Sequence, residues 1–156
     1  MSVNTEDIKK LREETGAGVL DCKRALDESK GNYGKAKEII KKKGLLKADK
    51  KASRETSQGI IETYVHGGGK VGVMLELLCE TDFVARNSDF KSLAHEIAMH
   101  IAAMDPKNME DLLKQNYIRD MSLTVETLIK QHIAKIGENI VLKKFERYAL
   151  GSQTEK

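Results

Sequence analysis

Residues 60–79 read IIETYVHGGGKVGVMLELLC, and this stretch decides the fold. Every second residue from 61 to 65, and again from 71 to 79, is β-branched, apolar or cysteine. A period of two is typical of strands with one buried face. The three glycines between the two runs supply a turn, because glycine adopts positive φ without strain. The stretch therefore predicts an antiparallel β-hairpin.

The residues after the hairpin predict helices and one more strand. Asn87 or Ser88 caps a helix that breaks before Pro106, and a weaker helix follows at about 109–115. Thr124 caps a clear helix that ends at Gly137, and 140–149 reads as a final strand. The fold class is therefore α+β, with a three-stranded antiparallel sheet and helices on one face. The apolar residues expected to face the core from these helices are Phe90, Leu93, Ala94, Ile97, Ile101, Val125, Leu128, Ile129, Ile133 and Ile136.

The first 44 residues predict a small satellite of three short helices. Asn4 and Thr5 cap the first helix, which stops at a turn containing two glycines. The second helix ends near Gly31 and the third at Gly44, each glycine being a natural C-terminal cap. The residues expected to face inward are Ile8, Leu11, Val19, Cys22, Ala25, Leu26, Ala36, Ile39 and Ile40. A unit this small buries too little surface to be very stable by itself.

These patterns divide the chain into four parts. Residues 1–45 form the three-helix module, 46–57 a basic linker or helix, 58–151 the α+β core, and 152–156 a polar tail. The 156 residues are 40% hydrophobic and 33% charged, which excludes a disordered tail and a fibre. There is no apolar run of about 18 residues and no apolar leader, so we expect a cytoplasmic protein. Cys22 and Cys79 are expected to be reduced, buried thiols.

Positive charge is concentrated between Lys23 and Arg54. This segment holds twelve basic and four acidic residues, an excess of eight positive charges. Two interpretations stay open: a solvated helical face, or a surface that meets an acidic partner, either nucleic acid or protein. Aromatic residues make up only 4% of the chain, which disfavours a platform on which bases stack.

Patterns that resemble enzyme motifs fail on their context. The GxGxxG spacing at Gly67 precedes a strand, whereas a dinucleotide site needs a helix there. His95 and His100 are five residues apart, which places them on different helix faces, whereas zinc-protease histidines are four apart. The carboxylates of Glu80 and Asp82 are close in sequence, but nothing places them across a pocket. We therefore expect no catalytic residue, no metal and no cofactor.

The unusual stretch is Thr81-Asp82-Phe83-Val84-Ala85-Arg86-Asn87, a connection from strand to helix. Phe83 has two interpretations there. It folds back as a core plug with Asp82 as a helix cap, or it is a wedge presented to a partner's pocket. The residues alone favour the plug, because exposed phenylalanine is normally avoided.

Three blocks of the chain resemble the elongation factor Ts family. They are residues 11–18, LREETGAG, followed by 21–26, DCKRAL; residues 81–87, TDFVARN; and residues 135–140, KIGENI. The resemblance spans nearly the whole chain in the right order. It implies a ubiquitin-associated-like fold for the N-terminal module, and exchange of guanine nucleotide on elongation factor Tu during translation.

The resemblance also implies the roles of individual residues. The apolar pair after the TGAG sequence, here Val19 and Leu20, docks on the partner's G domain; the family more often has methionines there. Thr81, Asp82, Phe83 and Val84 insert beside the partner's magnesium site, with Phe83 as the wedge. Such a factor performs no bond chemistry and needs no cofactor, membrane or nucleic acid.

One departure concerns size. Longer family members carry a second core subdomain and a coiled coil, for which 156 residues are too few. The chain is similar to compact members with one core subdomain, which can act as homodimers; no cysteine in the last strand or tail offers an intersubunit disulfide. Two alternatives stay open: a nucleic-acid-binding module that uses the basic segment, and a peptide-binding adaptor that uses the three-helix module alone.

Overall fold

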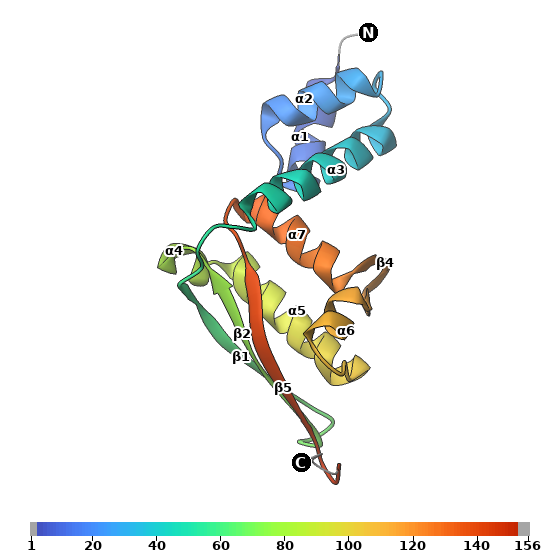
Figure 1. Cartoon of the computed structure of the whole chain (residues 1–156). Helices are drawn as coiled ribbons and strands as arrows, with labels where there is room; N and C mark the ends of the chain where they lie inside the picture. Colours follow the sequence, from blue (N-terminus) through green and yellow to red (C-terminus); the bar gives the residue numbers. More distant parts are fainter. Residues whose placement is uncertain (1–2, 153–156) are drawn as a thin grey trace.

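Three helices at one end and a sheet packed with helices at the other make up the computed structural model, which describes residues 3–152 (Figure 1). The elements are α1 (Thr5–Thr15), α2 (Val19–Glu28), α3 (Tyr33–Lys51), β1 (Gln58–His66), β2 (Val71–Cys79), α4 (Asp82–Ala85), α5 (Ser88–Met104), α6 (Met109–Lys114), β3 (Asn116–Tyr117), β4 (Asp120–Thr124), α7 (Val125–Ile136) and β5 (Val141–Ala149). The predicted α+β class is confirmed. The tail residues 153–156 lie outside the described residues, and the predicted division into four parts stays a prediction.

The N-terminal module has a small core of its own. The Asn4 side chain accepts a hydrogen bond from the Glu6 amide at 3.1 Å, and Gly16 ends α1 with a φ of 69°. Both predicted boundaries of this helix are confirmed. The buried residues of the module are Leu11, Cys22, Ala25, Leu26, Ala36 and Ile40. The prediction that Val19 faces inward with them is wrong, because Val19 stands in the first turn of α2 and is 49% exposed.

The third helix does not end at Gly44, as its sequence suggested; it continues to Lys51. The glycine lies where α3 crosses α7, and a Cβ added to it would approach the Cβ of Ala134 to 3.2 Å. The close approach explains the glycine better than a helix end does. Beyond it, Ala48 joins the main core, and Lys130 on α7 pairs with Asp49 at 3.0 Å. One helix therefore joins the module to the core.

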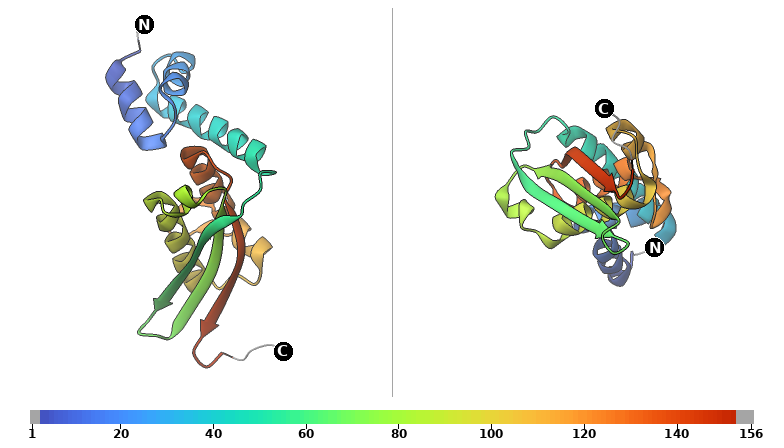
Figure 2. Two further views of the ribbon diagram at one scale, coloured as in Figure 1. Left: turned by 90° about the vertical axis from the view of Figure 1, so that its left-hand side faces the viewer. Right: turned by 90° about the horizontal axis from the view of Figure 1, so that it is seen from below.

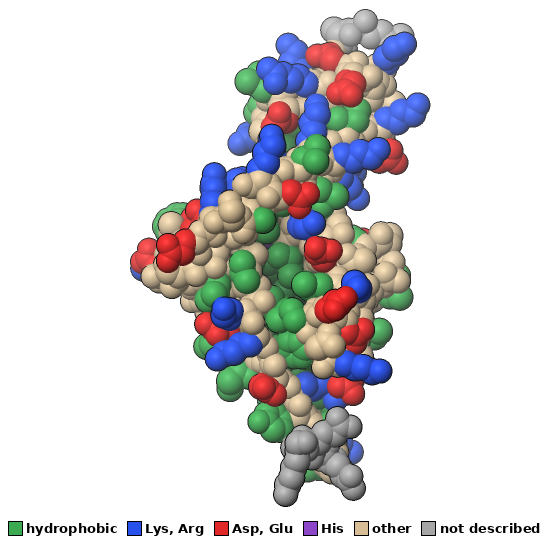
Figure 3. Space-filling model, in the orientation of Figure 1, with side chains coloured by type: hydrophobic (Ala, Val, Ile, Leu, Met, Phe, Trp, Pro, Cys, Tyr) green, Lys and Arg blue, Asp and Glu red, His purple; other side chains and the backbone are tan. Residues whose placement is uncertain are grey.

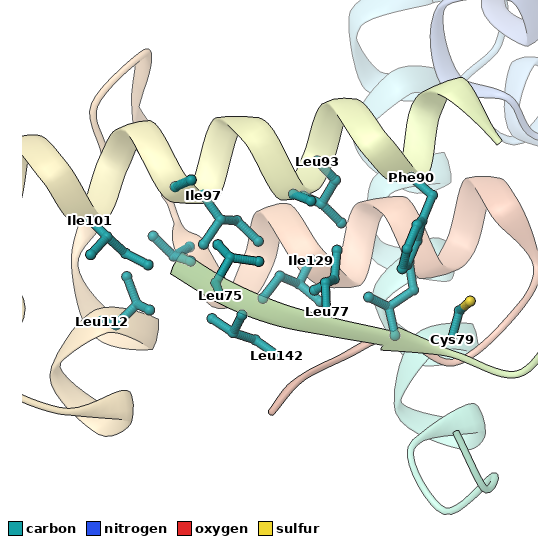
Figure 4. Packing of buried hydrophobic residues seen from close by; sticks show 14 of the residues in the cluster. Leu75, Leu77, Cys79, Phe90, Leu93, Ile97, Ile101, Leu112, Ile129 and Leu142 are labelled. Carbon is teal, nitrogen blue, oxygen red and sulfur yellow. The ribbon is translucent and has the colours of Figure 1, made fainter. Parts of the chain in front are cut away.

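The sheet has the strand order β1-β2-β5, and both pairs of strands are antiparallel. Gly67, Gly68 and Gly69 all have positive φ in the turn of the predicted hairpin. Val73, Leu75, Leu77 and Cys79 alternate toward the buried side of β2, as the period of two predicted. Helix α5 packs on this side, and α7 lies beside it and contributes Ile129 to the same core (Figure 4). Phe90, Leu93, Ala94, Ile97 and Ile101 of α5 are fully buried, as predicted.

The opposite side of the sheet is open in the described part of the chain. Figure 2, left, looks onto this side, with the helices behind the strands. The strand pairing places Thr63 of β1 and Glu146 of β5 beside Met74 of the central strand. Several large apolar side chains are exposed here: Ile61, Val65, Met74 and Tyr148. The alternating set of β1 that begins at Ile61 therefore does not face the core as its period suggested; Ile60 and Tyr64 pack against the core instead.

A small hairpin of β3 and β4 was not predicted. It is docked on α5 by His100, which is fully buried. The Ile118 amide donates to His100 Nδ1 at 3.3 Å, so the other ring nitrogen, Nε2, carries the proton and donates to Gln115 Oε1 at 2.9 Å. Tyr117 of the hairpin donates to Glu96 of α5. His100 is therefore bonded on both nitrogens by its own chain.

Candidate partner-binding site

The most exposed aromatic ring of the candidate site is Phe83, on the one-turn helix α4. The structure leaves 80% of this residue accessible, so the interpretation of Phe83 as a core plug is wrong. Its neighbours Val84 and Ala85 are buried and attach the turn to the core. Helix α4 lies beside the end of the sheet that faces the N-terminal helices (Figure 1). The Phe83 ring is thus exposed to solvent, while Val84 and Ala85 anchor the turn that carries it to the core.

The turn is capped by Thr81 and not by Asp82. The Thr81 hydroxyl accepts a hydrogen bond from the Val84 amide at 3.3 Å, whereas Asp82 is the first residue of the helix. Asp82 pairs instead with Arg86, one turn further on, and both side chains are largely exposed. This ion pair lines the same open surface as the Phe83 ring. Charged side chains at the edge of an apolar contact are typical of a protein-binding patch.

One side chain from a distant part of the chain reaches this turn. Glu138, which follows the end of α7, accepts hydrogen bonds from Thr81 and from the Glu80 amide. In the sequence Glu138 belongs to the family block 135–140, and no spacing or periodicity links it to Phe83. Burial, with the negative charge of Glu138 nearby, raises the pKa of Cys79 to about 11. The Cys79 thiol is therefore protonated at neutral pH, and it donates to the Thr81 carbonyl at 3.2 Å.

The second predicted contact, Val19 and Leu20, lies at the start of α2. Leu20 is 68% exposed, and its neighbour Val19 is half exposed. Cys22, two residues after Leu20 and therefore on the far side of the helix from it, is fully buried, so Leu20 points away from the core of the module. The structure does not bring this pair together with Phe83 into one pocket, because α2 and α4 belong to different parts of the fold (Figure 1).

Lysines and arginines gather over the N-terminal helices (Figure 3). A cavity of about 270 Å³ lies between the TGAG turn, α3 and α7. Acidic residues on its wall neutralise part of the charge: Lys37 pairs with Glu14 at 2.9 Å and Lys47 with Asp21 at 2.7 Å. The positive excess counted along the sequence therefore overstates the free charge of this surface.

Comparison with known proteins gives the family. The sequence model of the family described as Elongation factor TS matches residues 80–155, which include the Phe83 turn and Glu138. Elongation factor Ts of Fervidobacterium nodosum is 43% identical, with 97% of this chain and 100% of that protein aligned. This chain belongs to the elongation factor Ts family. Membership places it among the translation elongation factors, and it confirms the resemblance drawn from the three sequence blocks.

The relatives differ from this chain in length. Elongation factor Ts of Aquifex aeolicus is 54% identical over 95% of this chain, which covers 53% of that protein. The chloroplastic protein of Guillardia theta is 41% identical over the whole chain and 92% of its own length. The Fervidobacterium alignment spans 196 positions against 156 residues here, so at least 40 of its positions have no counterpart in this chain. The chain is therefore shorter than the Fervidobacterium protein.

No helix in residues 3–152 is both long enough and apolar enough to cross a membrane.

Proposed function

We propose that this protein is a guanine-nucleotide exchange factor that promotes GDP release from elongation factor Tu in the cytoplasm. The observation that carries the proposal is Phe83, an 80% exposed ring on a capped and anchored turn, in a chain of the elongation factor Ts family. A large apolar side chain held in water contributes little to folding, so its use lies in a partner. No bond is made or broken by such a factor.

Exchange needs differential binding and not catalysis. A factor that binds the nucleotide-free partner more tightly than the nucleotide-bound partner must weaken nucleotide binding by the same ratio. A magnesium ion neutralises the phosphates of the bound nucleotide, so displacing that ion is an effective way to loosen the nucleotide. In this proposal Thr81, Asp82, Phe83 and Val84 form the segment that enters the partner beside its magnesium site. Phe83 is the wedge, and Val84 holds the segment to the core.

A second contact makes insertion of the wedge more frequent. Val19 and Leu20 form an exposed apolar edge on α2 and are proposed to dock on the partner's G domain. Because α3 joins this module to the core as one helix, both contacts are carried on one framework. Two linked contacts raise the effective concentration of the second one once the first has formed.

The direct test is release of labelled GDP from elongation factor Tu. Stopped-flow traces are recorded without this protein and with increasing amounts of it. We expect the release rate to rise and then to saturate, while this protein alone hydrolyses no GTP. A release rate that is unchanged at saturating protein contradicts the proposal.

We further propose that the protein acts as a homodimer through the open side of its sheet. Ile61, Val65, Met74 and Tyr148 are exposed on that side, next to an ion pair between Lys144 and Glu76. An apolar patch of this kind on a soluble protein marks an interaction surface. Two such sheets, packed face to face, would bury these side chains in one interface.

A further inference from the structure

Two segments that are far apart in sequence meet where β2 ends. Glu138, 58 positions after Glu80, accepts three hydrogen bonds with its carboxylate. Oε1 accepts from the amides of Glu80 at 3.1 Å and Thr81 at 3.0 Å, and Oε2 accepts from the Thr81 hydroxyl at 2.7 Å. Hydrogen bonds to a charged acceptor are shorter and stronger than neutral ones. One carboxylate thus holds Thr81, the residue that caps α4.

Glu138 is itself held in place by its neighbour. The Asn139 amide donates to Glu80 Oε1 at 2.7 Å, so each segment bonds the backbone of the other. The Asn139 side chain is almost fully buried and donates to the carbonyls of Ala52, at 3.4 Å, and Arg54, at 2.9 Å. Hydrogen bonds therefore join the residues after α3, the end of β2 and the residues before β5.

The bond to the Thr81 hydroxyl also orients the cap of α4. A hydroxyl has one proton and two lone pairs. Because the Thr81 proton is directed to Glu138, a lone pair is free to accept the Val84 amide. Helix α4 has four residues, too few to hold a helical turn without outside support. Since the Phe83 ring is exposed, no core contact fixes it, and the backbone of the turn sets the direction of its Cα–Cβ bond.

We propose that Glu138 is a positioning residue for exchange: it fixes the α4 turn so that Phe83 is presented in its binding orientation before the partner arrives. The inference rests on the proposed exchange function. Without the carboxylate, the turn samples other orientations, and the apparent affinity falls with the fraction that remains competent. Glu138 acts through Phe83 and need not touch the partner.

The test is a double-mutant cycle on GDP release. Glu138→Ala should lower the catalysed release rate about tenfold in the wild-type background and by less than about twofold when Phe83 is already alanine. Glu138→Gln should keep most of the activity, because its amide oxygen still accepts the two backbone amides and its NH2 group donates to Thr81. Equal losses in both backgrounds overturn the proposal, because a general loss of stability would cost the same in each.

Hydrogen exchange of backbone amides supplies a readout without the partner. Glu138→Ala should speed exchange at the Val84 amide, which Glu138 does not contact, and leave the amides in the middle of β2 unchanged. The control is Thr124→Ala, which removes a cap of the same kind on α7 and should leave Val84 protected. If Glu138→Ala does not fold, Glu138→Asp replaces it. The shorter side chain should slow catalysed GDP release, and a release rate equal to that of wild type overturns the proposal.

The two proposals fail in different ways. If wild-type protein does not release GDP, the exchange function is wrong, whatever Glu138 does. If wild type releases GDP and Glu138→Ala does so equally well, or if the Val84 amide stays protected in that variant, the positioning role is wrong and the exchange function stands.

Discussion

Phe83 is the residue whose removal distinguishes a wedge from a structural side chain. Truncating a buried phenylalanine costs about 3–5 kcal/mol of unfolding free energy. Because Phe83 is exposed, we expect Phe83→Ala to change the unfolding free energy by no more than about 0.5 kcal/mol. Catalysed GDP release should fall strongly in the same variant. Thermal melting and stopped-flow release, measured on the same preparation, check both parts.

Removing magnesium adds a specific control to this experiment. If the ring acts by displacing the partner's magnesium ion, chelation performs that step without it. Wild type and Phe83→Ala should then release GDP at similar rates in excess EDTA. A deficit that persists undiminished without magnesium would show that the ring acts elsewhere, and a variant that unfolds would show that it is structural.

Val19 and Leu20 test the docking contact. Changing both to serine should weaken complex formation by about 1–3 kcal/mol if the pair forms a buried anchor in the complex. The fold should lose little, because both side chains are exposed. Leu46→Ser is a matched control, since Leu46 is also exposed but lies on α3. Affinity and circular dichroism are measured together; equal losses of binding and helix signal would assign the pair to the core.

At the scale of residues, the sequence predicts burial well only where a pattern is long. Phe83 and Val84 are adjacent apolar residues in a four-residue helix, so no period distinguishes the exposed one from the buried one. The family resemblance implied the wedge, whereas the residues alone favoured the plug. Val19 fitted the inward stripe of α2 by spacing, but the first turn of a helix has no preceding turn to pack against.

Gly44 is the place where one element crosses another, and its substitution tests that crossing. Gly44→Leu should destabilise the protein by about 1–3 kcal/mol, because a side chain there meets Ala134. Gly44→Ala should cost much less, since the gain in helix propensity of about 1 kcal/mol offsets a contact that is tight by a few tenths of an ångström. The free energies come from urea unfolding.

Two further variants control the Gly44 experiment. Gly34→Leu, in the first turn of the same helix, meets no core side chain and should not destabilise the protein. Ala134→Gly should recover part of the loss of Gly44→Leu. A leucine at 44 that is tolerated as well as at 34 would show that the crossing is not close in solution.

The β3–β4 hairpin should make stability depend on pH through His100. Burial lowers the pKa of this histidine below the usual value, while the hydrogen bond to Gln115 opposes the shift. The unfolded chain therefore takes up the proton first, so stability is complete above about pH 6.5 and is lost as pH falls through the folded-state pKa. An NMR titration should place the His100 midpoint below 6.5.

His132 must be separated from His100, because burial lowers its pKa as well. His100→Asn should reduce the slope of the unfolding free energy against pH between about pH 5 and 7. His132→Asn should reduce that slope only by the contribution of His132. A His100 midpoint at or above 6.5 would mean that the Ile118 amide does not hold the neutral ring.

At the scale of elements, strong periodicity and clear caps made most of the core predictable. The hairpin of β1 and β2 and the helices α5 and α7 all follow from such signals. The β3–β4 hairpin was missed because its strands are two and five residues long and do not alternate clearly. The end of α3 was predicted too early at Gly44. Glycine is common both at helix ends and where two helices cross closely, and the sequence alone does not distinguish the two cases.

At the scale of the whole molecule, the side of the sheet away from the helices is apolar and uncovered in residues 3–152, and this decides the last prediction. Met74 lies on the central strand of that side, so a charge there would stand in the middle of a face-to-face interface. Sedimentation should give a dimer at micromolar concentration for wild type and a monomer for Met74→Lys, because burying an ammonium group in the interface, even beside Glu146, removes charge from water and costs several kcal/mol. Met121→Lys, at an exposed methionine on β4 away from this sheet, should stay dimeric. The dimer should also melt at a higher temperature as protein concentration rises, since association stabilises only the folded chain. A wild-type monomer with full exchange activity would remove the interface and leave the Phe83 wedge as a property of the single chain.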